Sequence, residues 1–278
     1  MPDGCVGAIE AVLARVIDQM SNWEADSAIS LFNRSPIGAW MAIPRDMVSV
    51  LKSALEIARL SQGAFDPAVG RMVDAWGFGP GDGGGTMASG LPQQPWTAIE
   101  LAGDRARRLA DVALDFSGIA KGFAVDAAIA ALRDAGAANA LVEIGGEVRG
   151  IGVKPDIQPW WVDMETPLGF DFPPLRVALS GLAAATSGDY RRFRMEGGSR
   201  LSHNIDPTTG APVGDAVASV TVLHHSAMIA DAWATAILVS GVERGMALAK
   251  RHGLAARLIE RAPQPREHLT PVLAAMLA

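Results

Sequence analysis

Residues 226–236 read Ser-Ala-Met-Ile-Ala-Asp-Ala-Trp-Ala-Thr-Ala, a stretch with the length and apolar composition of a buried helix. Asp231 and Thr235 lie four residues apart in it, so a helix places both side-chain oxygens on one face. A buried carboxylate is costly unless a cation or hydrogen bonds meet it, and the sequence has no Lys or Arg between Arg200 and Arg244. Two interpretations are open. The pair supplies oxygen ligands to a hard cation such as Mg²⁺, or Asp231 caps a helix or accepts a bond from a distant backbone amide.

The composition is that of a folded globular protein. The chain has 278 residues, 49% hydrophobic and 19% charged, which suits one large domain or two intimately packed ones. Its net charge of −6 gives no support to nucleic-acid binding, which usually shows as a basic patch. Cys5 is the one cysteine, so a disulfide within the monomer and a cysteine-based zinc site are both excluded.

The sequence shows no targeting or membrane segment. No apolar run precedes Cys5, so no signal peptide is visible. The apolar stretch at 227–242 is too short to span a bilayer and contains Asp231. We therefore expect a cytoplasmic protein, or a periplasmic one if an export signal has been removed from this sequence.

Hydrophobic periodicity predicts helices and strands that alternate irregularly, without repeats or regular βαβ spacing. That order favours the α+β class over a doubly wound sheet. Residues 79–95 are rich in Gly and Pro and predict a surface loop, and the tail after 260 is expected to pack loosely. The predicted helices cover residues 9–20, 28–32, 45–61, 121–135, 227–239 and 243–252. The predicted strands cover 112–116, 140–153 as a pair broken at the two glycines 145 and 146, 160–165, 176–180, 218–224 and 255–260.

Three further segments carry polar groups suited to chemistry. Residues 115–122 combine a strand end, a small-residue turn and a helix start at Lys121, which suits a phosphate, although an ordinary connection with a solvated lysine has the same pattern. His203 precedes an Asp-Pro-Thr-Thr-Gly turn and is either a proton shuttle or a surface residue. Residues 185–190 form a polar cluster that either binds substrate or closes a loop. The adjacent pair His224 and His225 is interpreted as structural, because neighbouring strand residues face opposite ways.

In this order, the motifs resemble those of the ApbE family, which are flavin transferases. The resemblance covers about residues 10–260. The matching stretches are 20–33, Gly-Ala-Phe-Asp-Pro at 63–67, Trp-Gly-Phe-Gly at 76–79, 115–126, 142–147, 185–190, 202–210 and 230–235.

The resemblance implies a single domain over residues 1–278, with a T-fold-like α+β architecture of two intimately packed lobes and a nucleotide cleft between them. It implies that FAD is the substrate and that Mg²⁺ sits at the FAD pyrophosphate. The implied metal ligands are Asp231, Thr235 and the backbone carbonyl of Gly118, and His203 is the candidate for proton transfer. The implied flavin and adenine contacts are Trp23, Glu24, Ala25, Ala64, Phe65, Asp66, Asp115, Lys121 and Ile205.

The activity implied is that of an FAD:protein FMN transferase, which attaches FMN to a Thr or Ser hydroxyl of an acceptor protein and releases AMP. The alternatives are an FAD pyrophosphatase, in which water replaces the hydroxyl, and a flavin-binding protein without turnover. The expected partners are FAD and the acceptor protein, without nucleic acid, and a homodimer is open. The sequence departs from the family in two places. The usual first strand with Met-Gly-Thr is absent, and Asn204 stands where an apolar residue is more common.

Overall fold

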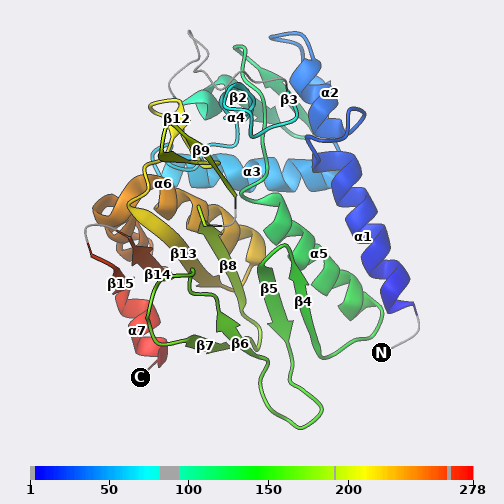
Figure 1. Ribbon diagram of the computed structural model, residues 1–278. Helices are drawn as coiled ribbons and strands as arrows, with labels where there is room; N and C mark the ends of the chain where they lie inside the picture. Colours follow the sequence, from blue (N-terminus) through cyan, green and yellow to red (C-terminus); the bar gives the residue numbers. More distant parts are fainter. Residues whose placement is uncertain (1–3, 82–93, 191, 262–263, 278) are drawn as a thin grey trace. The chain divides into compact units, whose positions relative to one another are not determined.

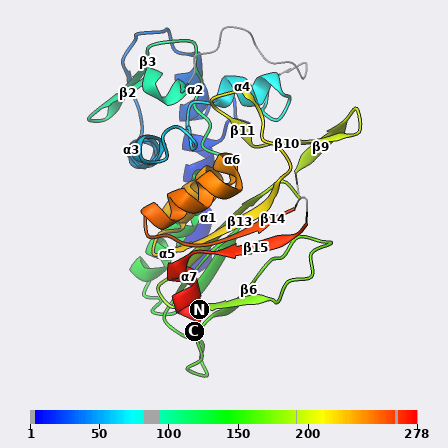
Figure 2. The same cartoon turned by 90° about the vertical axis from the view of Figure 1, so that its left-hand side faces the viewer.

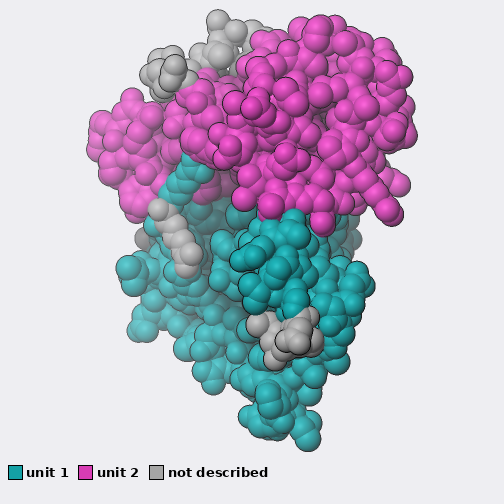
Figure 3. Space-filling model, turned by 90° about the vertical axis from the view of Figure 1, so that its right-hand side faces the viewer, with its two compact units in different colours: residues 1–13, 121–192, 215–278 teal, residues 14–120, 193–214 magenta. Residues whose placement is uncertain are grey.

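The computed structural model describes residues 4–81, 94–190, 192–261 and 264–277. The chain divides into two compact units, coloured separately in Figure 3. Unit 1 comprises Met1–Leu13, Lys121–Arg192 and Asp215–Ala278, and unit 2 comprises Ala14–Ala120 and Phe193–Gly214. Within the described ranges, no helix is both long and apolar enough to cross a bilayer.

Unit 1 is built on a six-stranded sheet in which every strand pair is antiparallel. The central strand, β13, is buried along all but its last residue, and it includes two buried polar residues, Ser219 and Thr221. Figure 1 shows the sheet. In spatial order its strands are β15 (Arg266–Leu269), β14 (Ala255–Glu260), β13 (Val217–His224), β8 (Ala183–Gly188), β5 (Glu147–Ile151) and β4 (Ala140–Ile144).

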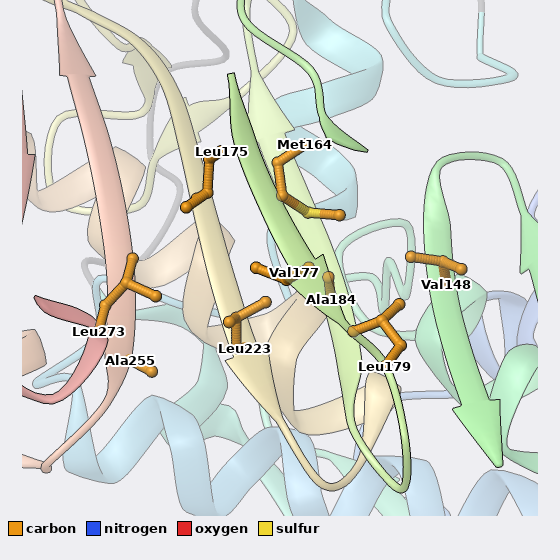
Figure 4. Packing of buried hydrophobic residues seen from close by; sticks show 9 residues of the cluster. All are labelled: Val148, Met164, Leu175, Val177, Leu179, Ala184, Leu223, Ala255 and Leu273. Atoms are coloured by element: carbon orange, nitrogen blue, oxygen red, sulfur yellow. The ribbon is translucent and has the colours of Figure 1, made fainter. Parts of the chain in front are cut away.

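The sheet of unit 1 has different covers on its two faces. Helix α6 (Ala227–Arg251) packs against β13, β8 and β14, and α5 (Ala120–Asp134) lies on the same side, as Figure 2 shows. The hairpin of β6 (Trp161–Met164) and β7 (Leu175–Ala178), together with α7 (Pro271–Leu277), covers the other face. Their buried side chains, including Val177 and Leu273, join Leu223 and Ala184 of the sheet in one apolar cluster (Figure 4).

Unit 2 contains short helices and small sheets. Its longest helix, α3 (Arg45–Leu60), is amphipathic and buries Met47, Leu51 and Ala58 among others, as the 3.6-residue period requires. The C-terminal part of α1 (Cys5–Met20) also belongs to this unit. The other elements are α2 (Ala28–Arg34), α4 (Gly70–Ala75), η1 (Pro95–Ala98), a sheet of β1 (Met41–Ala42), β3 (Arg105–Arg108) and β2 (Ile99–Ala102), and the pairs β9 (Phe193–Glu196) with β10 (Ser199–Ser202) and β11 (Ile205–Asp206) with β12 (Ala211–Pro212).

The α+β class and most predicted elements are confirmed, but the strand predicted at 112–116 is wrong. This segment makes one isolated bridge, between Val69 and Ala113. At Leu114 the backbone bonds to a side chain instead: the Asn33 amide donates to the Leu114 carbonyl at 2.9 Å, and the Asn33 oxygen accepts from the Leu114 amide at 2.7 Å. Asn22 donates to the same carbonyl at 3.1 Å. The segment is therefore extended without belonging to a ladder.

Three other expectations change. The tail is not loose, because β15 pairs with β14 and Leu273 of α7 is buried. The polar cluster at 185–190 is not a loop over most of its length, since it begins inside the central strand β8. The helices predicted at 227–239 and 243–252 form one element, α6, interrupted at Gly241 by non-helical backbone with φ 75° and ψ −177°. Most of the loop predicted at 79–95 lies outside the described residues.

Candidate functional site

Asp231 lies on a buried turn of helix α6 in unit 1, and the buried helix is what the sequence predicts. Its side chain is 2% exposed and accepts a hydrogen bond from the backbone amide of Gly122 at 3.1 Å. Lys121 Nζ lies 3.8 Å from the same carboxylate. The distant amide of the second interpretation is thus present, and so is a cation that the local sequence lacks.

Lys121 also contacts a buried carboxylate that sequence reasoning missed as a site residue. Its Nζ lies 2.5 Å from Oε1 of Glu147, whose side chain is 1% exposed at the start of β5. The other oxygen of Glu147, Oε2, is buried without a hydrogen-bond partner among the described residues. Lys121, Glu147 and Asp231 therefore form one cluster drawn from α5, β5 and α6.

Thr235 follows Asp231 by one helical turn. Its Oγ1 lies 3.0 Å from Oγ of Ser187, which projects from β8. The neighbouring β8 residue Thr186 bonds instead to Thr221 of β13 at 2.8 Å. Ser187 thus fixes the orientation of the Thr235 hydroxyl, and neither residue was linked to the other by the sequence.

The close approach of α5 to α6 requires glycine at position 122. A Cβ atom there would lie 2.5 Å from the carbonyl carbon of Ala227 and 2.7 Å from Cα of Met228, both backbone atoms. Because Gly122 has no side chain, its amide can reach Asp231 on α6. Glycine at position 122, in the first turn of α5, is therefore needed for the packing of α5 against α6.

The cluster contains two buried carboxylates and one ammonium group, so it has less positive than negative charge when both carboxylates are ionised. Burial raises the pKa of Asp231, and the Lys121 ammonium and the Gly122 amide oppose that rise. Burial and then the neighbouring Asp231 carboxylate raise the pKa of Glu147 to about 7, against the effect of Lys121. Burial acts to lower the pKa of Lys121, but the two carboxylates together raise it. One ammonium thus serves two buried carboxylates.

These groups fit a hard divalent cation. Asp231, Thr235 and the unpartnered oxygen of Glu147 offer only oxygen atoms, which is the donor type that Mg²⁺ prefers. In the ranges that the structure describes, no group of three or more His, Cys, Asp and Glu side chains could hold a metal ion. The predicted ligand set does not need such a group, because it combines one carboxylate with a hydroxyl and a backbone carbonyl.

The remaining predicted site residues belong to unit 2, and two of them lie in its small-residue turn. Gly118 is half-buried in the turn that precedes α5. Asp115 accepts a bond from the Ser117 amide at 2.7 Å, and its own amide donates to the Pro67 carbonyl at 2.8 Å. The turn is therefore fixed at its start by the Gly-Ala-Phe-Asp-Pro segment.

Asp66 is a third buried carboxylate, and it lies in unit 2. Its oxygens accept from the amides of Ala68 at 2.8 Å and Trp96 at 3.0 Å. Burial raises the pKa of Asp66 to about 7, although these two amides act to lower it. Its neighbours Ala64 and Phe65 are also buried, so the backbone shape of this segment is fixed by packing.

Trp23 and His203 have contrasting environments. Trp23 is 62% exposed, and its neighbours Glu24 and Ala25 are exposed as well, which leaves the indole available for stacking. His203 is half-buried on the connection between β10 and β11, with its ring edge-on to Phe78 at 6.5 Å between centroids.

The turn after His203 has the predicted form. The Gly210 amide donates to the Asp206 carbonyl, and Trp76 Nε1 donates to the Gly210 carbonyl at 2.7 Å. Ile205 is buried in a cluster with Phe78 and Met72. These contacts hold the histidine-bearing segment against α4.

Comparison with known proteins identifies the family. The model of the ApbE family matches residues 5–258. The chain belongs to the ApbE family. It is 38% identical over 267 residues to the FAD:protein FMN transferase of Vibrio cholerae, covering 90% of this chain and 78% of that protein. It is 35% identical over 267 residues to the protein of the same name from Haemophilus influenzae, covering 91% of this chain and 77% of that protein.

The fold of the ApbE family extends over almost the whole chain. The crystal structure of Pseudomonas stutzeri flavinyl transferase ApbE in its apo form matches it with a TM-score of 0.90 and 34% identity, covering 98% of this chain and 87% of that one. The predicted family and fold class are therefore confirmed, and the relatives carry the transferase activity that the resemblance implied. The roles of individual residues stay predictions.

Proposed function

We propose that this protein is an FAD:protein FMN transferase that uses Mg²⁺ and releases AMP. The relatives from Vibrio cholerae and Haemophilus influenzae are named for the transfer itself. The observation that carries the metal dependence is the cluster of Lys121, Glu147 and Asp231, in which two buried carboxylates share one ammonium. That imbalance suits a site completed by a divalent cation and an anionic substrate.

The proposed metal ligands are Asp231, Thr235 and the carbonyl of Gly118. When bound, Mg²⁺ neutralises phosphate charge and orients the pyrophosphate for displacement. Asp231 is held for this role by the Gly122 amide, and Thr235 is oriented by Ser187. These contacts keep the ligand oxygens on one face of α6 before any cation arrives.

Lys121 is the proposed phosphate contact. Glu147 holds its ammonium at 2.5 Å, while the lysine side chain remains 43% exposed. An ammonium that is anchored on one side and open on the other can donate to a phosphate oxygen. Trp23, Asp66, Asp115 and Ile205, with the residues next to them, are the proposed flavin and adenine contacts.

The proposed reaction transfers the FMN phosphoryl group from FAD to a hydroxyl of the acceptor protein. The hydroxyl oxygen of an acceptor Thr or Ser bonds to the FMN-side phosphorus, the bond from that phosphorus to the bridging oxygen breaks, and AMP leaves. His203 accepts the hydroxyl proton. A positioned general base typically increases the reaction rate about 10²–10⁴-fold. If water replaces the hydroxyl, the products are FMN and AMP, which defines the pyrophosphatase alternative.

One assay separates transfer from its alternatives. The purified protein is incubated with FAD, Mg²⁺ and a candidate acceptor domain, and both AMP release and the mass of the acceptor are followed. AMP with a flavinylated acceptor is the expected result. AMP with an unmodified acceptor indicates hydrolysis, and bound FAD without AMP indicates a binding protein; either result overturns the proposal for that acceptor.

The metal assignment has its own variant and control. Asp231→Asn keeps the side-chain volume but removes the charge, and we expect AMP release to disappear. Asp163→Asn is the matched control, because Asp163 forms an exposed pair with Arg176 on the β6–β7 hairpin. Unchanged AMP release by Asp231→Asn would contradict the metal role.

Two expectations from the sequence are tested separately. Fractionation of the native host followed by immunoblotting distinguishes the expected cytoplasmic location from the periplasmic alternative. Sedimentation equilibrium of the purified chain distinguishes a monomer from a homodimer.

A further inference from the structure

Asp126 on α5 collects four donors that no proposed ligand contact explains. Its Oδ1 accepts from Arg149 Nη1 at 2.5 Å and from the Ala227 amide at 3.0 Å. Its Oδ2 accepts from Ser226 Oγ at 2.6 Å and from the Met228 amide at 3.1 Å. The carboxylate therefore binds the first two amides of α6, the residue before them, and an arginine of β5.

This arrangement exceeds what capping α6 requires. Ser226 is already the N-cap residue, and its Oγ accepts from the Ile229 amide at 3.3 Å. A single cap residue commonly suffices at a helix start. Here Asp126 places a negative charge against the amide end of α6, where the helix dipole favours it, and Arg149 balances that charge from β5. The side chains of Asp126 and Arg149 are 18% and 17% exposed, so the pair is largely shielded from water.

The same three elements carry the candidate metal and phosphate cluster. Each element carries residues of both groups. Helix α5 carries Lys121 and Asp126, and strand β5 carries Glu147 and Arg149. Helix α6 carries Asp231, and Ser226 is its N-cap residue. The separations along the chain are short, so a shift at one cluster moves the other. The position of Asp231 at the Gly122 amide thus depends on where Asp126 holds the first turn of α6.

We propose that Asp126 is a positioning residue for the metal site, because it fixes the start of α6 against α5 and β5 and so sets the place of Asp231 and Thr235. The inference rests on the proposed function only in taking Asp231 and Thr235 as metal ligands. Asp126 itself touches neither metal nor substrate. Residues that orient metal ligands typically affect metal affinity about 10–100-fold when they are changed.

The test measures metal affinity rather than turnover. Mn²⁺ is titrated into the whole protein in the presence of ADP, which supplies a pyrophosphate but no flavin, and free Mn²⁺ is followed by electron paramagnetic resonance against a protein-free ADP blank. For Asp126→Asn we expect the Kd for Mn²⁺ to rise about 10–100-fold. A Kd within twofold of the parent protein in a folded variant would overturn the inference.

Two controls separate positioning from general destabilisation. Glu267→Gln removes the partner of the buried Arg257 on β14, in the same unit, and should lower stability without changing the Kd for Mn²⁺. Asp231→Asn should lose Mn²⁺ binding. If Asp231→Asn binds Mn²⁺ like the parent, the proposed metal site fails; if only Asp126→Asn does, the positioning role alone fails.

A second variant decides the matter if Asp126→Asn does not fold. Ser226→Ala removes one donor to Asp126 and the cap of the Ile229 amide, which typically costs about 1 kcal/mol of stability. A raised Kd for Mn²⁺ in this variant supports the inference. An unchanged Kd overturns it.

Discussion

Gly122→Ala tests the close packing of α5 and α6 most directly. The new methyl group would lie 2.5 Å from the Ala227 carbonyl carbon and 2.7 Å from Met228 Cα. Ordinary contact begins at 3.4 Å, and the obstructing atoms are backbone, so the helices must separate by about 1 Å. This separation also stretches the bond from the Gly122 amide to Asp231.

Two costs add in this variant. Overpacking of a dense interior costs about 1–3 kcal/mol. A hydrogen bond to a charged group contributes about 1.5–3 kcal/mol. Alanine recovers about 1 kcal/mol through its higher helix propensity. We therefore expect Gly122→Ala to lower the free energy of unfolding by about 3 kcal/mol, measured by urea unfolding followed by far-UV circular dichroism and tryptophan fluorescence.

Gly7→Ala is the matched control for this experiment. Gly7 lies inside helix α1 and in unit 1, and nothing lies within 4 Å of a Cβ added there. The same substitution should stabilise the protein by about 0.5–1 kcal/mol. The packing argument is refuted if Gly122→Ala lies within about 1 kcal/mol of the parent protein, or if both variants shift stability in the same direction.

Three further substitutions have defined outcomes. Because burial raises the pKa of Asp66 to about 7, the folded protein keeps a proton that the unfolded chain releases near pH 4. The free energy of unfolding contributed by Asp66 therefore falls between about pH 4 and 7, by about 4 kcal/mol at most, and urea unfolding of Asp66→Asn against pH should lack this fall. Asp189→Asn breaks a buried pair with Arg261 and should cost about 3–5 kcal/mol in urea unfolding; a loss below 1 kcal/mol contradicts the importance of that pair. Lys121→Met should weaken FAD binding, measured by flavin fluorescence, about 10–100-fold, whereas an unchanged Kd contradicts the proposed contact between Lys121 and a phosphate.

Local pattern was sufficient to predict the elements that carry the candidate site. The helix at residues 121–135 is observed at Ala120–Asp134, and the strand pair around the two glycines 145 and 146 is observed as β4 and β5. In each case the spacing of hydrophobic residues and the position of glycines, both read over a few residues, predict the element and where it ends. The burial of Asp231 also follows from the apolar residues on every side of it.

Contacts between distant segments could not be predicted in the same way. The Gly122 amide meets Asp231 across 109 residues of sequence, and the roles of Glu147 and Asp126 depend on three elements meeting. The strand predicted at 112–116 failed for a related reason. Its apolar pattern is that of a strand, but asparagine side chains from elsewhere bond the amide and carbonyl of Leu114, and no local signal reveals them.

Gly241 divides the long helix α6 into two helical segments. Its φ of 75° with ψ of −177° is a conformation that only glycine adopts readily, and it interrupts the helical ladder. The segment before it carries Asp231 and Thr235. The segment after it ends near His252, whose ring lies tilted against that of Trp233 with 4.8 Å between the ring centroids. Amide protons on the two sides of Gly241 should therefore exchange with solvent deuterium as two independent groups, and if the proposed metal ligands bind Mg²⁺, the segment that carries them should exchange more slowly when Mg²⁺ is added.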